Sequence, residues 1–317
     1  MAEAVDYKQI GSRPVRPDGL DKVTGRAQFG ADTVLPNMIH GKVLRSPHAH
    51  AKILSIDVSG ALALPGVFAA VCGADFPGGG IDGEVGGEGG GTLSDVAKNV
   101  MARDKVLYHG HAVAAVAAAS PLAAEAALEA IKVEYEPLPP VLDVLQAMQS
   151  DAVLVDENNY TNLPEKPEQP SNVANQGRLE RGSLEEGFAA ADVVVEREFQ
   201  CPMTHQGYIE PQACVASIEE DGRGTIWCST QGHFEFRAAA SKILGKDLSD
   251  LKIVPMEIGG GFGGKTVVYL EPVAALLSEK SGRPVKMTMN REEVFRATGP
   301  ASASVARIKV GATHDGT

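Results

Sequence analysis

The sequence is poor in cysteine, in aromatic residues and in positive charge. Its 317 residues include four cysteines and one tryptophan, and 29 lysines and arginines stand against 41 aspartates and glutamates, a formal net charge of −12. The cysteines form no C-x-x-C pair, so the spacing of a zinc or iron–sulfur site is missing. A basic excess is the usual sign of a nucleic-acid surface, and anionic membranes repel an acidic chain. We therefore expect neither nucleic acid nor a membrane as a partner.

Long apolar runs and targeting signals are also missing. No run reaches the roughly 20 apolar residues that cross a bilayer. The first residues, Met1 to Asp6, carry two acidic side chains. They lack both the apolar core of a secretion signal and a twin arginine. These absences predict a cytoplasmic protein.

Two pairs of histidines are spaced so that they could share one face of a strand. They are His48 with His50 and His109 with His111. Two rings on one face could hold a metal ion, but no third ligand lies near either pair in the sequence. We interpret these histidines as polar residues of loops or strand ends.

A short glycine-rich stretch lies between a predicted strand and a predicted helix. Residues 259–264 consist of five glycines and Phe262, and Lys265 and Thr266 follow. Because glycine has no side chain and costs backbone entropy to order, we do not expect this run to serve packing. We expect it to bring backbone N–H groups close to a ligand. The apolar stretch 251–258 predicts a strand before the loop, and 266–281 predicts a helix after it, an arrangement that binds anions.

Two nucleotide-binding patterns match the same stretch. Gly259 to Thr266 satisfies G-x-x-x-x-G-K-[ST], the phosphate loop, and the glycines also satisfy G-x-G-x-x-G, the dinucleotide fingerprint. A run so rich in glycine matches many glycine patterns, so neither match is specific. A phosphate-loop nucleotide-binding protein that uses Gly259 to Thr266 stays open as the alternative function, and a non-catalytic scaffold as a third.

The order of the elements predicts an α+β chain with two domains. Residues 1–145 combine short strands with an alanine-rich helix, residues 146–178 are a linker rich in Asn and Pro, and residues 179–317 form a second unit. In the second unit we expect a helix from Ser183 and one at 234–244, and strands at 193–199, 213–218, 225–229, 283–289 and 304–312. The last strand runs into a turn that ends at Thr317 without a pairing partner, so we expect the natural protein to continue.

Five segments, spread in order along the chain, resemble one protein family. They are an N-terminal match that begins at Ile10 and includes Leu44 to Ala51, then Gln206 to Pro211, Cys228 to Gly232, Gly259 to Lys265, and Asn290 to Glu293 with Thr298 and Gly299. Together they resemble the molybdopterin-binding large subunit of the xanthine dehydrogenase and aldehyde oxidase family, the molybdenum hydroxylases. The resemblance implies an a/b hammerhead domain at 1–145. It also implies a first, mixed α/β molybdopterin-binding domain at 179–317 that is truncated at its C-terminus.

The resemblance implies residues that contact the cofactor. In the family, the glutamine that matches Gln231 hydrogen-bonds an oxygen ligand of molybdenum, and the amides that match Gly261, Phe262 and Gly263 reach the cofactor. No residue of the chain is implied to ligate the metal directly. A neutral amide suits a metal-bound oxygen, and a backbone without side chains leaves room for a bulky pterin. The Phe262 side chain is interpreted either as a wall of the substrate channel or as a core anchor.

The implied activity is oxidative hydroxylation of an aldehyde or an N-heteroaromatic substrate with oxygen derived from water. The implied cofactor is molybdenum-molybdopterin, which bacterial relatives often use in a cytosine dinucleotide form. Electrons would pass to a small [2Fe-2S] subunit and a medium FAD subunit, in a dimer of heterotrimers.

The catalytic base of the family is a glutamate that we expect beyond Thr317, so no catalytic residue is assigned within the chain. The chain alone is therefore expected to be inactive. Glu210 is interpreted as structural. Thr266 stands where some relatives have a glutamate near the substrate, so purine specificity is not predicted.

Overall fold

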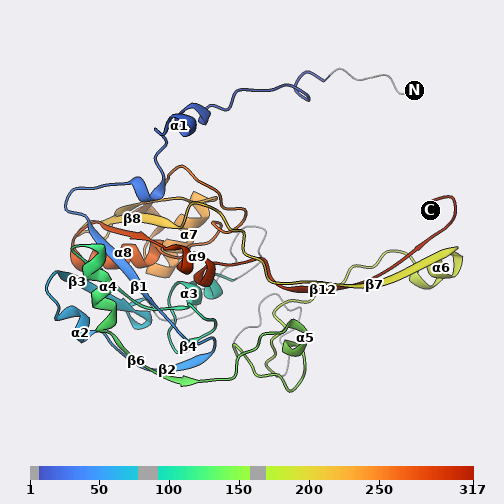
Figure 1. The fold of residues 1–317 in the computed structure, drawn as a ribbon, viewed down its shortest axis with the longest axis horizontal. Coiled ribbons are helices and arrows are strands. Elements are labelled where there is room, and N and C mark those ends of the chain that lie inside the picture. The colour runs from blue at the N-terminus through green and yellow to red at the C-terminus, as the bar shows by residue number, and fades with distance from the viewer. Residues whose placement is uncertain (1–6, 78–91, 158–168) are drawn as a thin grey trace.

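A mixed seven-stranded sheet runs through the middle of the molecule and combines strands from both halves of the sequence (Figure 1). The computed structural model describes residues 7–77, 92–157 and 169–317. The strand order is β10-β9-β8-β11-β1-β5-β3. The strands are β1 (Ile39–Arg45), β3 (Val67–Cys72), β5 (Ala112–Ala118), β8 (Ala213–Ile218), β9 (Gly224–Cys228), β10 (Leu251–Pro255) and β11 (Val285–Thr288).

The two halves of the sequence meet where β1 pairs with β11. These strands run parallel, with Ile39 beside Val285 and Gly41 beside Met287. A Cβ at Gly41 would lie 2.7 Å from Cγ of Met287, so any side chain at this position would force Met287 to shift. The segments 1–145 and 179–317, expected as separate domains, thus share one sheet. Their boundaries stay a prediction, and residues 158–168 of the expected linker lie outside the described residues.

Helices cover both faces of this sheet, and β5 shows why both faces are apolar. All seven residues of β5 are buried. Ala115 and Ala117 pack in the cluster that contains α7 (His233–Leu244) and α8 (Glu271–Ser281), whereas Ala114 and Val116 pack on the opposite face, towards α4 (Pro121–Glu129). Strand alternation therefore supplies two apolar layers from one short stretch.

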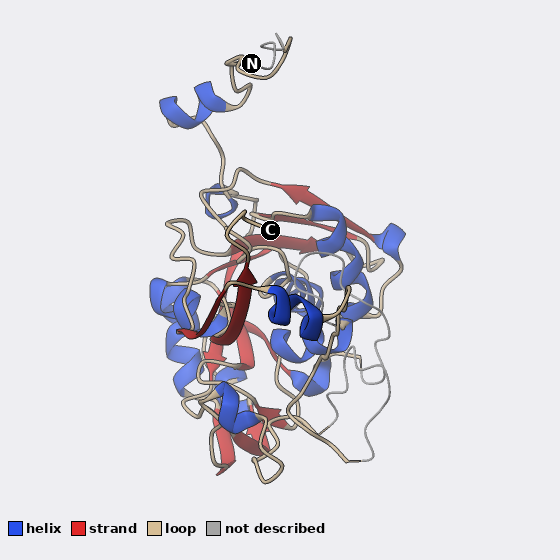
Figure 2. Cartoon of the chain, turned by 90° about the vertical axis from the view of Figure 1, so that its right-hand side faces the viewer, coloured by secondary structure: helices blue, strands red, loops and turns tan. Residues whose placement is uncertain are grey.

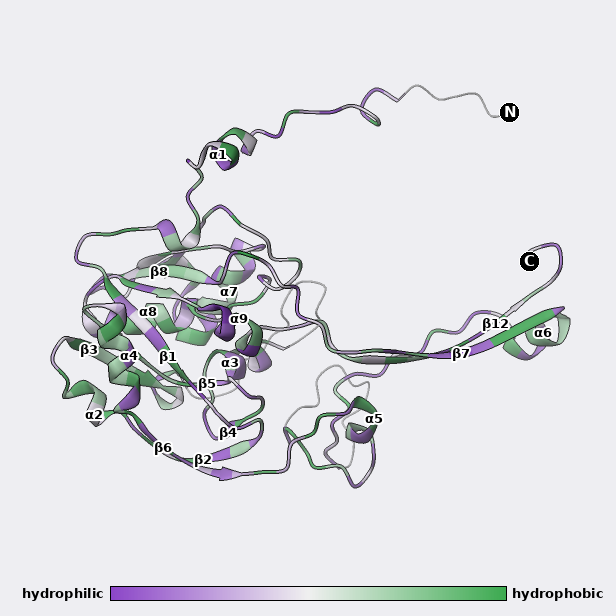
Figure 3. Cartoon of the chain, viewed as in Figure 1, coloured by the Kyte–Doolittle hydropathy of each residue, from purple (hydrophilic) through white to green (hydrophobic). Residues whose placement is uncertain are grey.

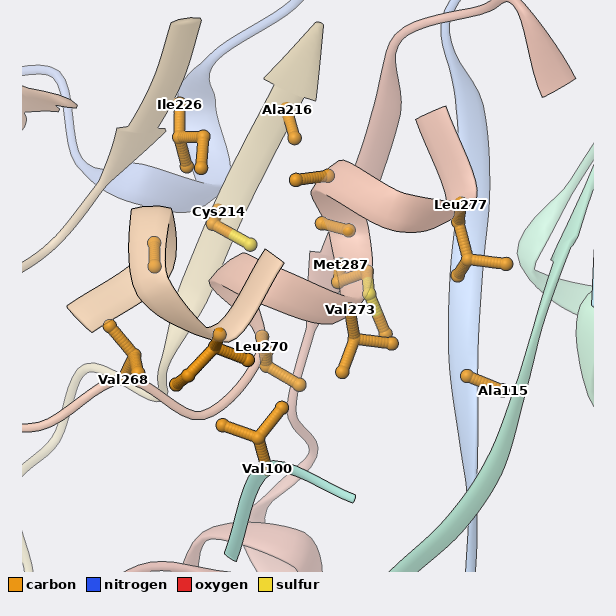
Figure 4. Packing of buried hydrophobic residues seen from close by; sticks show 14 of the residues in the cluster. Val100, Ala115, Cys214, Ala216, Ile226, Val268, Leu270, Val273, Leu277 and Met287 are labelled. Atoms are coloured by element: carbon orange, nitrogen blue, oxygen red, sulfur yellow. The ribbon is translucent and has the colours of Figure 1, made fainter. Parts of the chain in front are cut away.

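The larger cluster is the main core of the described residues (Figure 4). Figure 4 shows Val273 of α8 beside Met287 of β11, and Leu277 of the same helix on the side of Ala115 of β5. Helix α3 (Leu93–Val100) contributes Val100 to the same cluster. This core supports the backs of β8 and β9, which carry the segments described as the candidate site below.

Two smaller sheets lie beside the main one. The first has the order β4-β2-β6 and is formed by β2 (Ala51–Asp57), β4 (Lys105–Val106) and β6 (Lys132–Pro137). The second is a ribbon of β7 (Val193–Cys201) and β12 (Ser304–Ala312), paired antiparallel over nine residue pairs. The sequence predicted strand 304–312 correctly, but the expectation that it lacks a partner is wrong, since β7 pairs with it.

The ribbon extends away from the main sheet, with α6 (Leu184–Ala190) at its far end (Figure 1). Figure 3 shows that the end of β7 next to α6 is hydrophobic. One face of the ribbon exposes apolar side chains from both strands, and Arg197 lies among them opposite Ile308. That face carries Val193, Val195, Phe199, Ile308 and Val310.

The remaining helices are short. They are α1 (Gly19–Thr24), α2 (Ser59–Leu62), α5 (Val144–Ala147) and α9 (Arg291–Ala297). Helix α1 stands out from the body in Figure 1 and Figure 2, and an ion pair between Lys22 and Glu257 connects it to the body. Within the described ranges, no helix has the length and apolar character needed to cross a membrane.

The structure confirms the predicted α+β class and corrects two elements that flank the glycine stretch. The hairpin of β8 and β9 and the helix before Gly245 lie where the sequence predicted them. The helix expected at 266–281 begins only at Glu271, with Pro272 in its first turn. The strand expected at 251–258 ends at Pro255. The glycine loop therefore does not run directly into a helix, because proline favours the first turn and several residues intervene.

Candidate functional site

The candidate site is the glycine loop, defined as residues 259–264, together with the segments it touches. Three of its residues have backbone angles in the left-handed region: Gly260 at φ +102°, Gly263 at φ +90° and Phe262 at φ +50°. A non-glycine residue there is uncommon and marks a backbone held in place by its surroundings. The Phe262 side chain is 74% exposed, so its interpretation as a core anchor is wrong.

The other glycines are needed because neighbouring side chains lie against the backbone. A Cβ on Gly259 would lie 2.7 Å from Cβ of Glu210, and one on Gly264 would lie 2.5 Å from Cε1 of Tyr208. A Cβ on Gly261 would lie 2.5 Å from Oε1 of Gln231. The expectation that the glycine run does not serve packing is thus wrong at these three positions.

Gln231, which follows β9, is fixed by the loop through its side-chain oxygen. Oε1 accepts hydrogen bonds from the N–H of Gly263 at 3.1 Å and from the N–H of Lys265 at 3.2 Å. The backbone N–H of Gln231 donates to the carbonyl of Lys265 at 2.9 Å. Because both partners of the side chain are donors, the oxygen must face the loop and the NH2 group must face away. Among the described residues, Nε2 has no hydrogen-bond partner, and Gln231 is exposed.

The amides of the loop differ in their availability. The N–H of Gly263 donates to Gln231, and the N–H of Gly259 donates to Glu210 at 2.6 Å. The N–H groups of Gly261 and Phe262 donate to no acceptor in the described part of the chain. Two of the three amides expected to reach a cofactor are therefore free to do so. The third, that of Gly263, instead orients Gln231.

A buried ion pair lies beneath the loop. Nζ of Lys265 donates to Oε2 of Glu210 at 2.6 Å, and the lysine is 1% exposed. Burial lowers the pKa of Lys265, and the carboxylate of Glu210 opposes that shift. A phosphate-loop lysine must reach a ligand, whereas this ammonium is enclosed and already paired. The phosphate-loop interpretation of Gly259 to Thr266 is therefore contradicted, both by Lys265 and by the late start of α8.

A directional chain of hydrogen bonds supports the loop from behind. Nε2 of Gln212 donates to the hydroxyl of Tyr208 and, at 3.2 Å, to the carbonyl of Gly264. The Tyr208 hydroxyl lies 3.1 Å from Oγ1 of Thr298, which donates to the carbonyl of Val294 in α9. With its only proton committed to that carbonyl, Thr298 must accept from Tyr208. Tyr208 is 1% exposed, so this chain ties the loop to the interior.

Glu271, the first residue of α8, is a second buried carboxyl group near the site. It is 3% exposed, and Oε2 accepts from the N–H of Tyr269 at 3.0 Å. Burial raises its pKa to about 7, while nearby backbone amides and Lys265 oppose the shift. Burial also raises the pKa values of the Cys214 and Cys228 thiols, which are free and buried.

In the described part of the chain, no group of three or more His, Cys, Asp or Glu side chains could hold a metal ion. His111 is buried and bonds the N–H of Leu107 and the carbonyl of Lys98, and Nδ1 of His50 bonds the carbonyl of Pro139. The interpretation of these histidines as structural polar residues is consistent with those contacts. Tyr208 lies within the family-like segment Gln206 to Pro211 and Glu271 lies in none of the five segments, and what distinguishes both residues is their burial in the fold.

Comparisons with known proteins agree on both halves of the chain. Residues 24–139 match the family description "Aldehyde oxidase and xanthine dehydrogenase, a/b hammerhead domain", and residues 165–317 match "Molybdopterin cofactor-binding domain". The nicotinate dehydrogenase large molybdopterin subunit of Eubacterium barkeri is 32% identical over 311 residues, which are 98% of this chain and 68% of that protein. The carbon monoxide dehydrogenase large chain of Afipia carboxidovorans is 33% identical over 97% of this chain.

Solved structures show the same likeness. Quinoline 2-oxidoreductase from Pseudomonas putida 86 superposes with a TM-score of 0.80 and 30% identity, over 97% of this chain and 38% of that chain. The chain also spans 38% of the Afipia carboxidovorans relative. It therefore corresponds to less than half the length of these two proteins.

Proposed function

Because the chain belongs to the xanthine dehydrogenase and aldehyde oxidase family, as part of a molybdopterin-binding large subunit, we propose that its glycine loop and Gln231 hold one side of a molybdenum-molybdopterin cofactor. The observation that carries this proposal is the orientation of Gln231. Its oxygen is engaged by two loop amides, and its NH2 group is left facing outward as an unpaired neutral donor among the described residues.

The donor set fits such a cofactor in three respects. The NH2 group of Gln231 can donate to a metal-bound oxygen without adding charge. The free amides of Gly261 and Phe262 can donate to the cofactor beside it. The loop presents glycine backbone where a side chain would obstruct a bulky ligand. When bound, the cofactor would supply two-electron oxidation of the substrate with oxygen derived from water.

The residues of this chain would bind and orient rather than react. Gln231 would fix one oxygen at the metal, and the rigid loop would keep that donor in place before the ligand arrives, which is how preorganised dipoles lower a barrier. The exposed Phe262 ring would form part of the wall against which the substrate lies. The proposed substrate is an aldehyde or an N-heteroaromatic ring, and the general base would come from outside this chain.

Membership of the family also supports a proposal about the partner subunits. We propose that the chain works in a large subunit that passes electrons to a small [2Fe-2S] subunit and a medium FAD subunit, arranged as a dimer of heterotrimers in the cytoplasm. A cytosine dinucleotide form of the pterin is the form we expect for the cofactor.

The test is metal and pterin analysis of the complete protein, purified from its host, with variants at Gln231. Wild type should carry stoichiometric molybdenum. Gln231→Glu keeps an oxygen that accepts from Gly263 and Lys265 but removes the NH2 donor, so it should fold normally and lose activity by about a hundredfold or more. Gln231→Ala removes both interactions and serves as the comparison. A wild-type protein without molybdenum would overturn the proposal, and so would full activity in Gln231→Glu.

A further inference from the structure

We infer that Glu210 is a positioning residue, whose carboxylate ties the two ends of the glycine loop together and so holds the loop in the shape that receives the cofactor. The inference rests on the proposed function of the loop. It assigns Glu210 no contact with the cofactor or the substrate.

One oxygen of Glu210 reaches both ends of the loop. Oε2 accepts from the N–H of Gly259, the first loop residue, at 2.6 Å. The same oxygen accepts from Nζ of Lys265, the residue directly after the loop, at 2.6 Å. The backbone N–H of Glu210 also donates to the carbonyl of Gly259 at 3.3 Å. Charge-assisted hydrogen bonds of this length are strong, so the carboxylate holds the first residue of the loop and the residue after the loop close together.

Glu210 is itself held from the opposite side. The guanidinium of Arg291, the first residue of α9, donates to the carbonyl of Tyr208 at 2.8 Å and to that of Ile209 at 2.6 Å. Pro211 follows Glu210 and fixes φ on the other side. The carboxylate is therefore presented to the loop by a segment that is fixed on both sides.

The Glu210 carboxylate also affects Gln231, through Lys265. The ammonium of Lys265 bonds Glu210, while the backbone N–H of the same residue bonds Oε1 of Gln231 at 3.2 Å. If Lys265 moves, Gln231 loses one of the two donors that set its orientation. Glu210 thus controls the direction of the NH2 group of Gln231 without touching it.

The position of Lys265 depends on the charge of Glu210. The Lys265 side chain is fully buried, and its ammonium also lies 5.2 Å from the ring centroid of Tyr208. A buried charge without a counter-charge is strongly unfavourable, so the lysine must move or lose its proton when the carboxylate is removed. The other charged groups that face Lys265 are Glu271, which favours the ammonium, and Arg291, which disfavours it.

The experiment compares variants of the complete protein, purified with its partner subunits. Glu210→Gln keeps the size of the side chain but removes the charge that Lys265 needs. Glu210→Gln with Lys265→Met removes both charges. Leu277→Ala, in the core of α8, is the control that lowers stability without touching the loop. The readouts are molybdenum and released pterin per chain, and the melting temperature.

We expect Glu210→Gln to retain at least tenfold less molybdenum and pterin than wild type, while Leu277→Ala, at an equal or larger loss of melting temperature, retains the cofactor. The double variant should recover melting temperature without recovering the cofactor. It also provides the test if the single variant fails to fold.

Wild-type cofactor content in either Glu210 variant would overturn the inference. It would also be overturned if Leu277→Ala lost as much cofactor as Glu210→Gln at the same loss of melting temperature, because cofactor loss would then follow stability alone. A wild-type protein that carries no molybdenum would instead overturn the proposed function. The two failures are therefore distinguishable.

Discussion

At the scale of single residues, burial decides what the two carboxyl groups near the loop can do. Glu210 forms an ion pair with the Lys265 ammonium at 2.6 Å. Glu271 is more deeply buried, and its carboxylate accepts from a backbone amide rather than from a cation. Desolvation therefore dominates at Glu271 and raises its pKa to about 7.

Glu271 should make the stability of the protein depend on pH. The folded state holds the proton up to about pH 7, whereas the unfolded chain releases it near the ordinary value of 4.5. The folded state therefore binds more protons in that window, and the free energy of unfolding should fall as pH rises from 4.5 to 7 and then level off. The shift corresponds to a loss of up to roughly 3 kcal/mol.

Glu271→Gln removes this titration and keeps an acceptor for the N–H of Tyr269. Relative to wild type, the variant should gain stability as pH rises through the same window. Denaturant unfolding at several pH values measures the difference, and Glu279→Gln, at the surface of the same helix, is the matched control. An unchanged slope in Glu271→Gln would mean that Glu271 is ionised in the folded protein throughout.

At the scale of elements, local sequence patterns predicted the positions of helices and strands, but they did not predict which distant strands pair. Strands β8, β9 and β12 follow from alternating side chains, and the end of α7 follows from Gly245. Both signals are local, and the structure places these elements where they were predicted. The pairing of β12 with β7 and of β1 with β11 joins segments far apart in the chain, which no local pattern reports. The start of α8 was missed because an apolar pattern cannot tell an extended stretch from a helix until Pro272.

The candidate site shows the same division. Gln231 and the loop were selected from their resemblance to a family, and the structure brings them within hydrogen-bond distance. The reasons for the individual glycines were hidden, because they lie in the side chains of Glu210, Gln231 and Tyr208, which approach from other segments. Composition alone showed a glycine-rich loop. It did not show which glycines are required by a neighbouring side chain and which by a positive φ.

The glycines of the loop should therefore respond differently to alanine. At Gly263 the methyl group meets open space but φ is +90°, so alanine should cost about 1 kcal/mol or more in strain alone. Gly282, also in open space at φ +62°, should cost a similar amount and is the control outside the site. At Gly261 the methyl group would lie 2.5 Å from Oε1 of Gln231, so alanine should displace that side chain.

Chemical denaturation and cofactor content separate these effects. Gly263→Ala and Gly282→Ala should lose comparable stability, whereas Gly261→Ala should lose cofactor out of proportion to its stability. If Gly261→Ala binds cofactor as wild type does, the contact with Gln231 is not needed for binding.

At the scale of the whole molecule, the seven-stranded sheet makes the two halves of the chain depend on one another. Without β11, strand β1 would expose an edge whose residues are built for burial, since Ile39 and Val285 are both fully buried. Exposed strand edges invite aggregation, and the β1 edge of the half that contains β1, β3 and β5 is covered by β11 of the other half. We expect the halves to unfold together even though the sequence suggests two domains.

This cooperativity can be measured at the β1–β11 pair. Trp227 on β9 is the only tryptophan and reports the second half by fluorescence, while amide hydrogen exchange of β5 reports the first. Gly41→Val forces a side chain against Met287. It should lower the free energy of unfolding reported by Trp227 and the free energy of opening reported by the amides of β5 by the same amount, about 1–3 kcal/mol. Gly177→Val, in open space, is the control.

Equal shifts at both probes require one cooperative unit, because strain at the pair is then felt across the whole sheet. A shift at Trp227 that leaves the exchange of β5 unchanged would show that the halves open independently. In that case the shared sheet would be a contact between two separately stable units, and the resemblance-based boundaries near residues 145 and 179 would describe the energetics better than the strand order does.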